Sequence, residues 1–215
     1  MRYKQLEQKK MNNTAQQILE SAYELFLDKG YKNVTTRDIA SYAGVNLGLI
    51  TYYFGTKDQL GSMVLDSINE MLYQKAFETK LPDDTGSAEK LCVYTVLLWR
   101  YSDKKMFRFA SELANTNKEN LRMGNTFQNL AWAVIQDYHL SVTPLENEVY
   151  LTVFKSSELA LIQRMFDHSL NITLEDIADI LLSNYFFNIG LSDQTILFIL
   201  NRCRDILQSL PLEAK

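Results

Sequence analysis

The chain has 215 residues, 47% of them hydrophobic, and a formal net charge of −4 at pH 7. Three prolines and eight glycines are few for this length, so the composition favours long helices with short connections in one large or two modest domains. No run of about 20 uncharged apolar residues occurs and no apolar stretch follows the charged N-terminus, so we expect neither a membrane span nor a secretory signal, but a cytoplasmic protein.

The first helix is predicted at about 13–29. Ile18, Leu25 and Phe26 recur at helical spacing and form one apolar stripe. Gly30 follows where this pattern stops, as is common after the last turn of a helix. The segment therefore leads the chain as an amphipathic helix.

Two shorter helices are predicted at about 36–43 and 47–53. Thr35 or Thr36 can cap the first of them, because a threonine oxygen accepts from the free backbone N–H groups of a first turn. Gly44 stands between them, where the backbone has to adopt a conformation that is costly for a residue with a side chain. Two helices joined by such a turn are typical of a DNA-reading helix-turn-helix, although a helical hairpin of an ordinary bundle shows the same pattern.

The stretch 12–65 resembles the DNA-binding half of the TetR family of bacterial transcriptional regulators. The residues that carry the resemblance are Gly30-Tyr31, Thr35-Thr36-Arg37, Ile39-Ala40, Ala43-Gly44-Val45, Tyr53-Phe54, Lys57 and Leu60. It implies an all-α protein, with a three-helix helix-turn-helix DNA-binding domain at 1–57 and a larger helical bundle at 58–215 that binds a ligand and dimerises. The chain departs from the family pattern at Leu49 and Thr51, which bears on the operator sequence that it reads.

The two short helices supply the predicted contacts to double-stranded operator DNA. The Arg37 guanidinium can clamp a guanine edge or a phosphate, and Leu47 can contact a thymine methyl. Tyr52 is expected either to bind an outer phosphate or to pack, and Tyr53 either to bind a phosphate or to join the core of the head. By resemblance, phosphate contacts fall on Thr36, Tyr53 and Lys57, and base contacts on Arg37, Leu47 and Thr51. The full predicted set is Thr35, Thr36, Arg37, Asn46, Leu47, Gly48, Thr51, Tyr52, Tyr53 and Lys57.

Charge is distributed unevenly along the chain. Residues 1–57 carry eight Lys or Arg against five Asp or Glu, a net charge of +3, so residues 58–215 carry −7. Because phosphate binding depends on local charge, this asymmetry is consistent with a small DNA-binding head on an acidic body.

The remaining chain is also predicted to be helical. A helix at about 57–79 starts at the cap Thr56 and joins the head to the body, and the clearest loop follows at 81–87, with a proline, a glycine and two acidic residues. Apolar spacing then predicts helices at about 88–102, 104–114, 118–140, 144–167, 173–190 and 192–210. The sequence therefore predicts an all-α chain of nine or ten helices.

The sequence shows no enzymatic constellation. His139 and His168 lie near the ends of predicted helices, where a cation complements the helix dipole, and neither has the spacing of paired metal ligands. Cys92 and Cys203 lie far apart within apolar patterns, which is more typical of buried structural thiols than of a disulfide or a redox sensor. We therefore predict neither enzyme activity nor a metal or cofactor.

Aromatic and sulfur-containing side chains crowd the middle of the chain. Such stripes usually form a core, yet helical bundles also bind ligands in mainly apolar pockets between helices. The resemblance implies a cavity of this kind for a small apolar or amphipathic effector. Its predicted wall is Trp99, Phe107, Met123, Phe127 and Trp132, with Arg100, Arg108 and Gln128 as neighbours that either supply polar contacts or are solvated.

The last two helices are predicted to form a homodimer interface. Residues 180–190 and 196–203 are apolar around more of the helix circumference than a one-sided surface helix needs, and excess apolar surface usually binds a partner. The alternative is deep burial within the monomer. The predicted interface residues are Phe186, Phe187, Leu197 and Phe198.

These features predict a TetR-like transcriptional regulator, and more specifically a repressor relieved by a small-molecule effector. A regulator that answers a protein or no effector is the first alternative. The second is a helical enzyme or metabolite carrier with an incidental helix-turn-helix.

Overall fold

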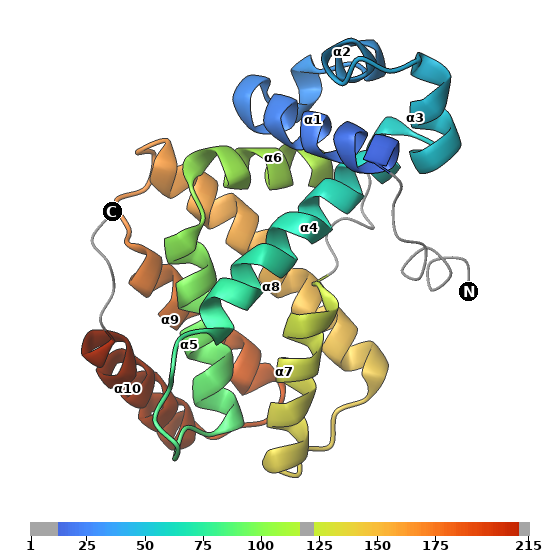
Figure 1. Cartoon of the computed structure of the whole chain (residues 1–215). Coiled ribbons are helices and arrows are strands. Elements are labelled where there is room, and N and C mark those ends of the chain that lie inside the picture. Colours follow the sequence, from blue (N-terminus) through green and yellow to red (C-terminus); the bar gives the residue numbers. More distant parts are fainter. Residues whose placement is uncertain (1–12, 117–122, 211–215) are drawn as a thin grey trace.

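The computed structural model describes residues 13–116 and 123–210, and every regular element in those ranges is a helix. Figure 1 shows a head at one end and a larger body, with α4 running from beneath the head towards the far end of the body. The head contains α1 (Asn13–Lys29), the 3-10 helix η2 (Tyr31–Asn33), α2 (Thr36–Tyr42) and α3 (Leu47–Phe54). The body contains α4 (Lys57–Phe77), α5 (Ser87–Tyr101), α6 (Lys104–Ala114), α7 (Asn125–Asp137), α8 (Pro144–Phe166), α9 (Leu174–Asn188) and α10 (Asp193–Ser209).

The all-α prediction is confirmed, and the predicted helix bounds agree closely with the observed ones except for α7. This helix was expected at 118–140, of which residues 118–122 lie outside the described residues. The helix ends at Asp137. His139 adopts a left-handed backbone with φ of 52°, and the N–H of Leu140 donates back to the carbonyl of Ile135 at 2.9 Å. Such a turn satisfies the last carbonyls of a helix and stops it.

Four helices begin with the same reciprocal cap. A threonine hydroxyl accepts from the backbone N–H of the third helical residue, whose side chain accepts from the backbone N–H of the threonine. The pairs are Thr35 with Asp38 in α2, Thr56 with Gln59 in α4, Thr143 with Glu146 in α8 and Thr173 with Asp176 in α9. Of the two threonines that the sequence offers for α2, the structure thus uses Thr35.

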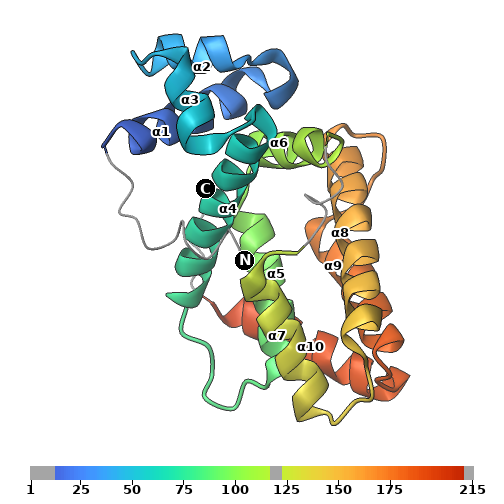
Figure 2. The same ribbon diagram turned by 90° about the vertical axis from the view of Figure 1, so that its right-hand side faces the viewer.

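Two large clusters of buried side chains form most of the core of the described residues. The body cluster surrounds α5, against which α4, α7, α9 and α10 pack, as Figures 1 and 2 show. The head cluster joins α1, α2 and α3, and it also takes Leu60 and Val64 from α4 and Phe109 and Leu113 from α6. The domain boundary at residue 57 stays a prediction, because the core of the head continues beyond it.

Helix α6 lies across the base of the head (Figure 2). The ring of Phe109 stacks on that of Phe26, with centroids 5.3 Å apart. Arg108 donates from Nη2 to the carbonyl oxygen of Leu27 at 2.8 Å, where the last turn of α1 leaves acceptors free. The body thus supports the head directly, and Arg108 does not supply a polar contact to an effector as the sequence allowed.

In the described ranges, no helix has both the length and the apolar character that crossing a bilayer requires. Cys92 on α5 and Cys203 on α10 are both buried and free, as predicted, and burial raises the pKa of the Cys92 thiol. A buried thiol with a raised pKa is a poor nucleophile, which supports a structural role.

Candidate DNA-binding surface and effector pocket

The turn between α2 and α3 has the geometry of a helix-turn-helix. Gly44 adopts φ of +64° with open space around it, so backbone conformation rather than packing selects glycine here. The N–H of Val45 bonds to the carbonyl of Ala40 at 3.0 Å, which closes the end of α2. Asn46 then caps α3, because its Oδ1 accepts from the N–H of Gly48 at 2.9 Å. Asn46, which was predicted to contact DNA, therefore has a structural role as well.

Gln17 on α1 fixes this turn, and sequence reasoning missed it. Its Nε2 donates to the carbonyl of Ala43 at 2.8 Å, although the two residues are 26 positions apart. The contact holds the turn against α1. No local pattern in the sequence predicts such a contact, because it depends on how α1 and α2 cross.

Helix α3 has one buried and one exposed face. Ile50 and Phe54 are buried in the head, whereas Leu47 is 39% and Tyr52 is 77% exposed. Gly48 and Thr51 are exposed on the same helix, and Arg37 is exposed on the first turn of α2. The structure therefore leaves the predicted base-reading residues on the surface of α2 and α3, and their contact with bases stays a prediction.

Thr35 is engaged within α2. Its hydroxyl donates to Asp38 Oδ2 at 2.6 Å and accepts from the backbone N–H of Asp38 at 3.2 Å. These hydrogen bonds from the Thr35 hydroxyl and backbone hold the pKa of Asp38 below its usual range. Thr35 thus stabilises the start of α2, while Thr36 is half-buried beside it.

Lys57 is turned towards the head rather than into solvent. Its ammonium donates to the carbonyl oxygen of Tyr31 at 2.7 Å and lies 4.0 Å from the centre of the Tyr31 ring. Burial lowers the pKa of Lys57. A phosphate contact by Lys57 stays a prediction, because the ammonium has further N–H donors.

Tyr53 combines the two roles that the sequence left open. Its ring is half-buried against the core of the head and lies edge-on to Tyr52, with centroids 4.9 Å apart. Packing of Tyr53 is therefore observed, and its phosphate contact stays a prediction.

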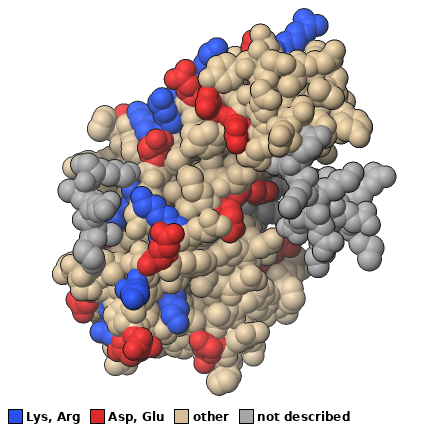
Figure 3. Space-filling model, in the orientation of Figure 1, with Lys and Arg blue, Asp and Glu red and all other residues tan. Residues whose placement is uncertain are grey.

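The charge asymmetry of the head depends on residues outside the described ranges. Residues 1–12 contain four of the eight basic residues counted for 1–57, and residues 13–57 contain four basic and four acidic residues. Figure 3 shows acidic and basic side chains interspersed over the body and few on the visible face of the head. The described part of the head is therefore not strongly basic.

The predicted effector residues do not form one wall. Trp99 and Phe127 both pack against Phe154 in the buried core, with ring centroids 6.5 and 5.4 Å away. Phe107 lies elsewhere, against Phe166, with ring centroids 5.8 Å apart. The indole N–H of Trp99 donates to Glu158, a buried carboxylate, at 2.6 Å. These three aromatic residues have packing partners within the chain.

Met123 and Trp132, by contrast, line a pocket of about 170 Å³ between α7 and α8. Sequence reasoning missed its α8 side. The pocket wall includes Met123, Gln128, Trp132, Asn147, Leu151 and Thr152. Because Gln128 was named as a polar neighbour of the cavity, three sequence-predicted residues meet here.

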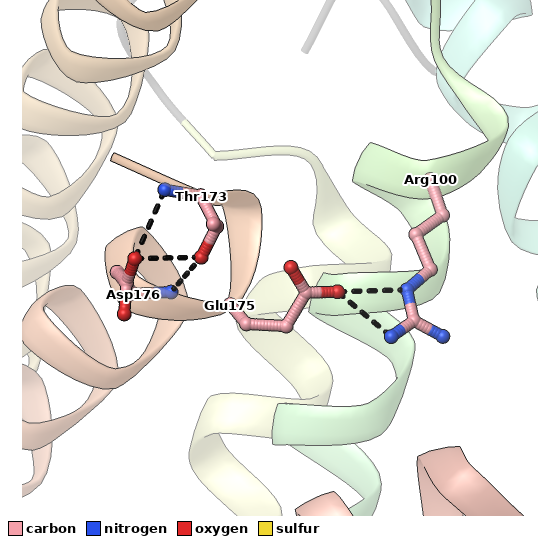
Figure 4. A network of polar contacts seen from close by, with 4 residues as sticks. All are labelled: Arg100, Thr173, Glu175 and Asp176. Atoms are coloured by element: carbon pink, nitrogen blue, oxygen red, sulfur yellow. Dashed lines mark hydrogen bonds and ion pairs between the residues drawn. The ribbon is translucent and has the colours of Figure 1, made fainter. Parts of the chain in front are cut away.

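Arg100 forms an ion pair with Glu175, away from this pocket. Figure 4 shows that its guanidinium donates to Glu175 Oε1 in the first turn of α9, at 2.8 Å from Nη2. The same figure shows the cap of α9, in which Thr173 and Asp176 bond to each other. Arg100 thus links α5 to α9 and is not a polar contact of the pocket.

One predicted interface residue is wrong. Phe186 is fully buried in the body core, at 0% exposure, and cannot contact a second subunit. Phe187, Leu197 and Phe198 are 66%, 59% and 63% exposed, respectively. Ile180, the first residue of the predicted range 180–190, is also exposed and lies one heptad before Phe187.

No group of three or more His, Cys, Asp or Glu side chains with metal-binding geometry occurs among the described residues. His139 and His168 both have positive φ values, 52° and 55°, two residues after the ends of α7 and α8. They take the left-handed position that ends a helix, which histidine tolerates better than most residues.

Residues 18–61 match the family model described as bacterial regulatory proteins, tetR family. The HTH-type transcriptional repressor Rv3405c of Mycobacterium tuberculosis is 46% identical over 55 residues, which are 26% of this chain and 29% of that protein. The probable HTH-type transcriptional regulator YttP of Bacillus subtilis is 32% identical over 101 residues, which are 45% of this chain and 48% of that protein. The chain thus spans less than half the length of these curated relatives.

Similarity of fold extends over nearly the whole chain. The solved structure of RolR in complex with resorcinol covers 93% of this chain and 96% of its own, with a TM-score of 0.59 and 19% identity. At that identity the likeness shows the fold alone. The helix-turn-helix at α2 and α3 lies within the residues that match the family model. Residues 18–61, which contain the helix-turn-helix, therefore belong to the tetR family of bacterial regulatory proteins.

Proposed function

We propose that the chain is a homodimeric, DNA-binding transcriptional regulator of the cytoplasm, and that it represses genes until a small molecule releases it from its operator. The observation that carries the DNA-binding part is the exposed face of α3, held in place by the Gly44 turn. An α-helix presented in this way fits the major groove, where base edges can be read. The family consists of regulators, so the helical-enzyme alternative loses its support.

A homodimer is supported by the apolar side chains that α9 and α10 leave exposed. Phe187, Leu197 and Phe198 are large and more than half exposed. Exposed apolar side chains on two helices that pack together are typical of a protein–protein interface. A two-fold dimer through these helices doubles the number of heads, and two heads can bind two half-sites of one operator.

Release by a small molecule is supported by two observations. The pocket between α7 and α8 has both polar and apolar side chains in its wall. RolR, whose fold is similar, has been solved with resorcinol bound. An effector that binds the DNA-free conformation more tightly weakens operator binding, and DNA weakens effector binding by the same factor. A regulator that answers a protein partner remains the alternative and predicts no response to any small molecule.

The test is titration of the purified dimer with the promoter fragment of its own gene, at several salt concentrations. Arg37→Ala should weaken specific binding by roughly 1–3 kcal/mol and relax the preference at one position of each half-site. Arg37→Lys separates the two roles of this residue, because lysine keeps the charge but loses the guanidinium fork that reads guanine. Lys57→Ala should weaken binding to all sequences alike and flatten the salt dependence.

Two results would contradict the proposal. If the protein binds no promoter fragment more tightly than non-specific DNA, it does not recognise an operator. If Arg37→Ala binds the operator with unchanged specific affinity, Arg37 does not contact the bases, and α3 alone would read them.

A further inference from the structure

The wall of the pocket between α7 and α8 contains the amide of Asn147, which is hydrogen-bonded at its oxygen only. Asn147 is 2% exposed, and its Oδ1 accepts from the hydroxyl of Tyr185 at 2.8 Å. Among the described residues, no group accepts a hydrogen bond from its Nδ2. Nδ2 is also not one of the side-chain atoms that are fully shielded from solvent and lack a hydrogen-bond partner. The Nδ2 group therefore reaches the open space of the pocket. An oxygen of a bound ligand can accept a hydrogen bond from this N–H group in place of a water molecule.

The orientation of this amide is fixed by Tyr185 on α9. Burial keeps the pKa of Tyr185 far above its usual value, so the phenol stays neutral and keeps its proton. A neutral phenol donates to Oδ1, which leaves the Asn147 N–H groups for the pocket. Asn147 is thus held as a donor by a residue 38 positions away in the sequence.

The rest of the wall offers further polar groups of both kinds. Gln128 donates from Nε2 to the carbonyl of Met123 at 2.7 Å, which leaves its Oε1 as an acceptor. Among the described residues, no hydrogen bond engages the indole N–H of Trp132, which also lines the pocket. Glu148 adds an acidic side chain to the lining.

The size of the pocket limits the ligand. An apolar cavity of about 150 Å³ binds benzene, so a volume of about 170 Å³ holds one aromatic ring with a small substituent. Met123, Leu151 and the indole of Trp132 supply the apolar contacts that such a ring requires.

We infer that this pocket binds a single-ring aromatic molecule that carries a hydroxyl or carbonyl oxygen, and that Asn147 donates a hydrogen bond to that oxygen. Relief of repression by this ligand rests on the proposed function, whereas binding of the ligand does not.

Calorimetric titration of the full chain without DNA tests the ligand class, with benzamide and toluene as probes. Both have one aromatic ring, and toluene lacks the oxygen. Benzamide should bind more tightly than toluene by roughly 3- to 10-fold, the effect of one net hydrogen bond. Equal affinity for benzamide and toluene would overturn the inference.

Variants locate the site. Thr152→Phe should fill the pocket from its exposed rim and abolish benzamide binding. The matched control is Ser156→Phe, one turn further along α8 and outside the pocket lining, which should leave binding unchanged. Asn147→Leu should reduce benzamide affinity to that of toluene. If Asn147→Leu does not fold, because Tyr185 loses its partner, the Thr152 and Ser156 pair decides. Equal binding by both of those variants would overturn the site.

Operator binding is measured separately, so the two proposals fail in different ways. Benzamide binding by a protein that retains no DNA fragment would contradict the proposed function and leave the pocket assignment intact. Operator binding without benzamide binding would contradict the pocket assignment alone.

Discussion

Replacing Phe109 with alanine tests whether α6 of the body is part of the core of the head. The Phe109 ring is fully buried at 0% exposure, and it lies 5.3 Å from the ring of Phe26 and 6.0 Å from that of Tyr31. Removing a phenylalanine from such a site costs about 3–5 kcal/mol of unfolding free energy, because transfer energy is lost and a cavity remains. Total stabilities are about 5–15 kcal/mol, so this is a large fraction.

The matched control is Phe107→Ala, two residues earlier on α6. Phe107 is half-buried and contacts Phe166 in the body, so we expect a smaller loss, of about 1 kcal/mol. The melting temperature of a chain of this size falls by about 2–4 °C for each kcal/mol, which gives roughly 6–20 °C for Phe109→Ala. Urea unfolding followed by circular dichroism measures the free energies.

Operator titration of both variants, at a temperature where each is folded, shows whether the head is affected. We expect weaker operator binding by Phe109→Ala, because Phe26 and Tyr31 lose the support of α6. Equal losses of unfolding free energy in the two variants, or a loss below about 1 kcal/mol for Phe109→Ala, would refute the assignment of α6 to the head core.

Two further predictions concern the dimer and the cap of α2. Phe198→Asp, at a position 63% exposed, should give monomers in sedimentation and a collapse of operator affinity, because an unpaired charge cannot be buried in an apolar interface; an intact dimer would place the interface elsewhere. The folded-state pKa of Asp38 is lowered, so its contribution to stability is present above its unfolded pKa of about 3.9 and is lost as the pH falls through the folded value. Asp38→Asn should therefore be less stable than the parent at neutral pH, and urea midpoints should converge on acidification; parallel curves would contradict this.

Local chemistry made the helices and the helix-turn-helix predictable. Threonine caps such as Thr56 and Thr143 satisfy the donors of a first turn with residues three positions away, so the sequence contains both partners. Gly44 is predictable for the same reason, because its positive φ is a property of the turn itself. The family resemblance, carried by these residues, was confirmed by the family model over residues 18–61.

Contacts between distant segments were not predictable. Phe186 and Phe187 are neighbours of the same type, and only the packing of α9 onto the body buries one and exposes the other, since successive helix residues point about 100° apart. Arg108 and Lys57 read as free cations in the sequence, but each is bound to a backbone carbonyl of the head.

The sequence by itself determined the all-α class, the position of each helix except α7, and the helix-turn-helix, because capping and periodicity act over a few residues. The tertiary structure alone decided which aromatic residues are core, that α6 supports the head, and that Asn147 and Tyr185 set a donor in the pocket. Those features depend on how helices cross, and crossing is fixed by the packing of the whole core rather than by any local segment.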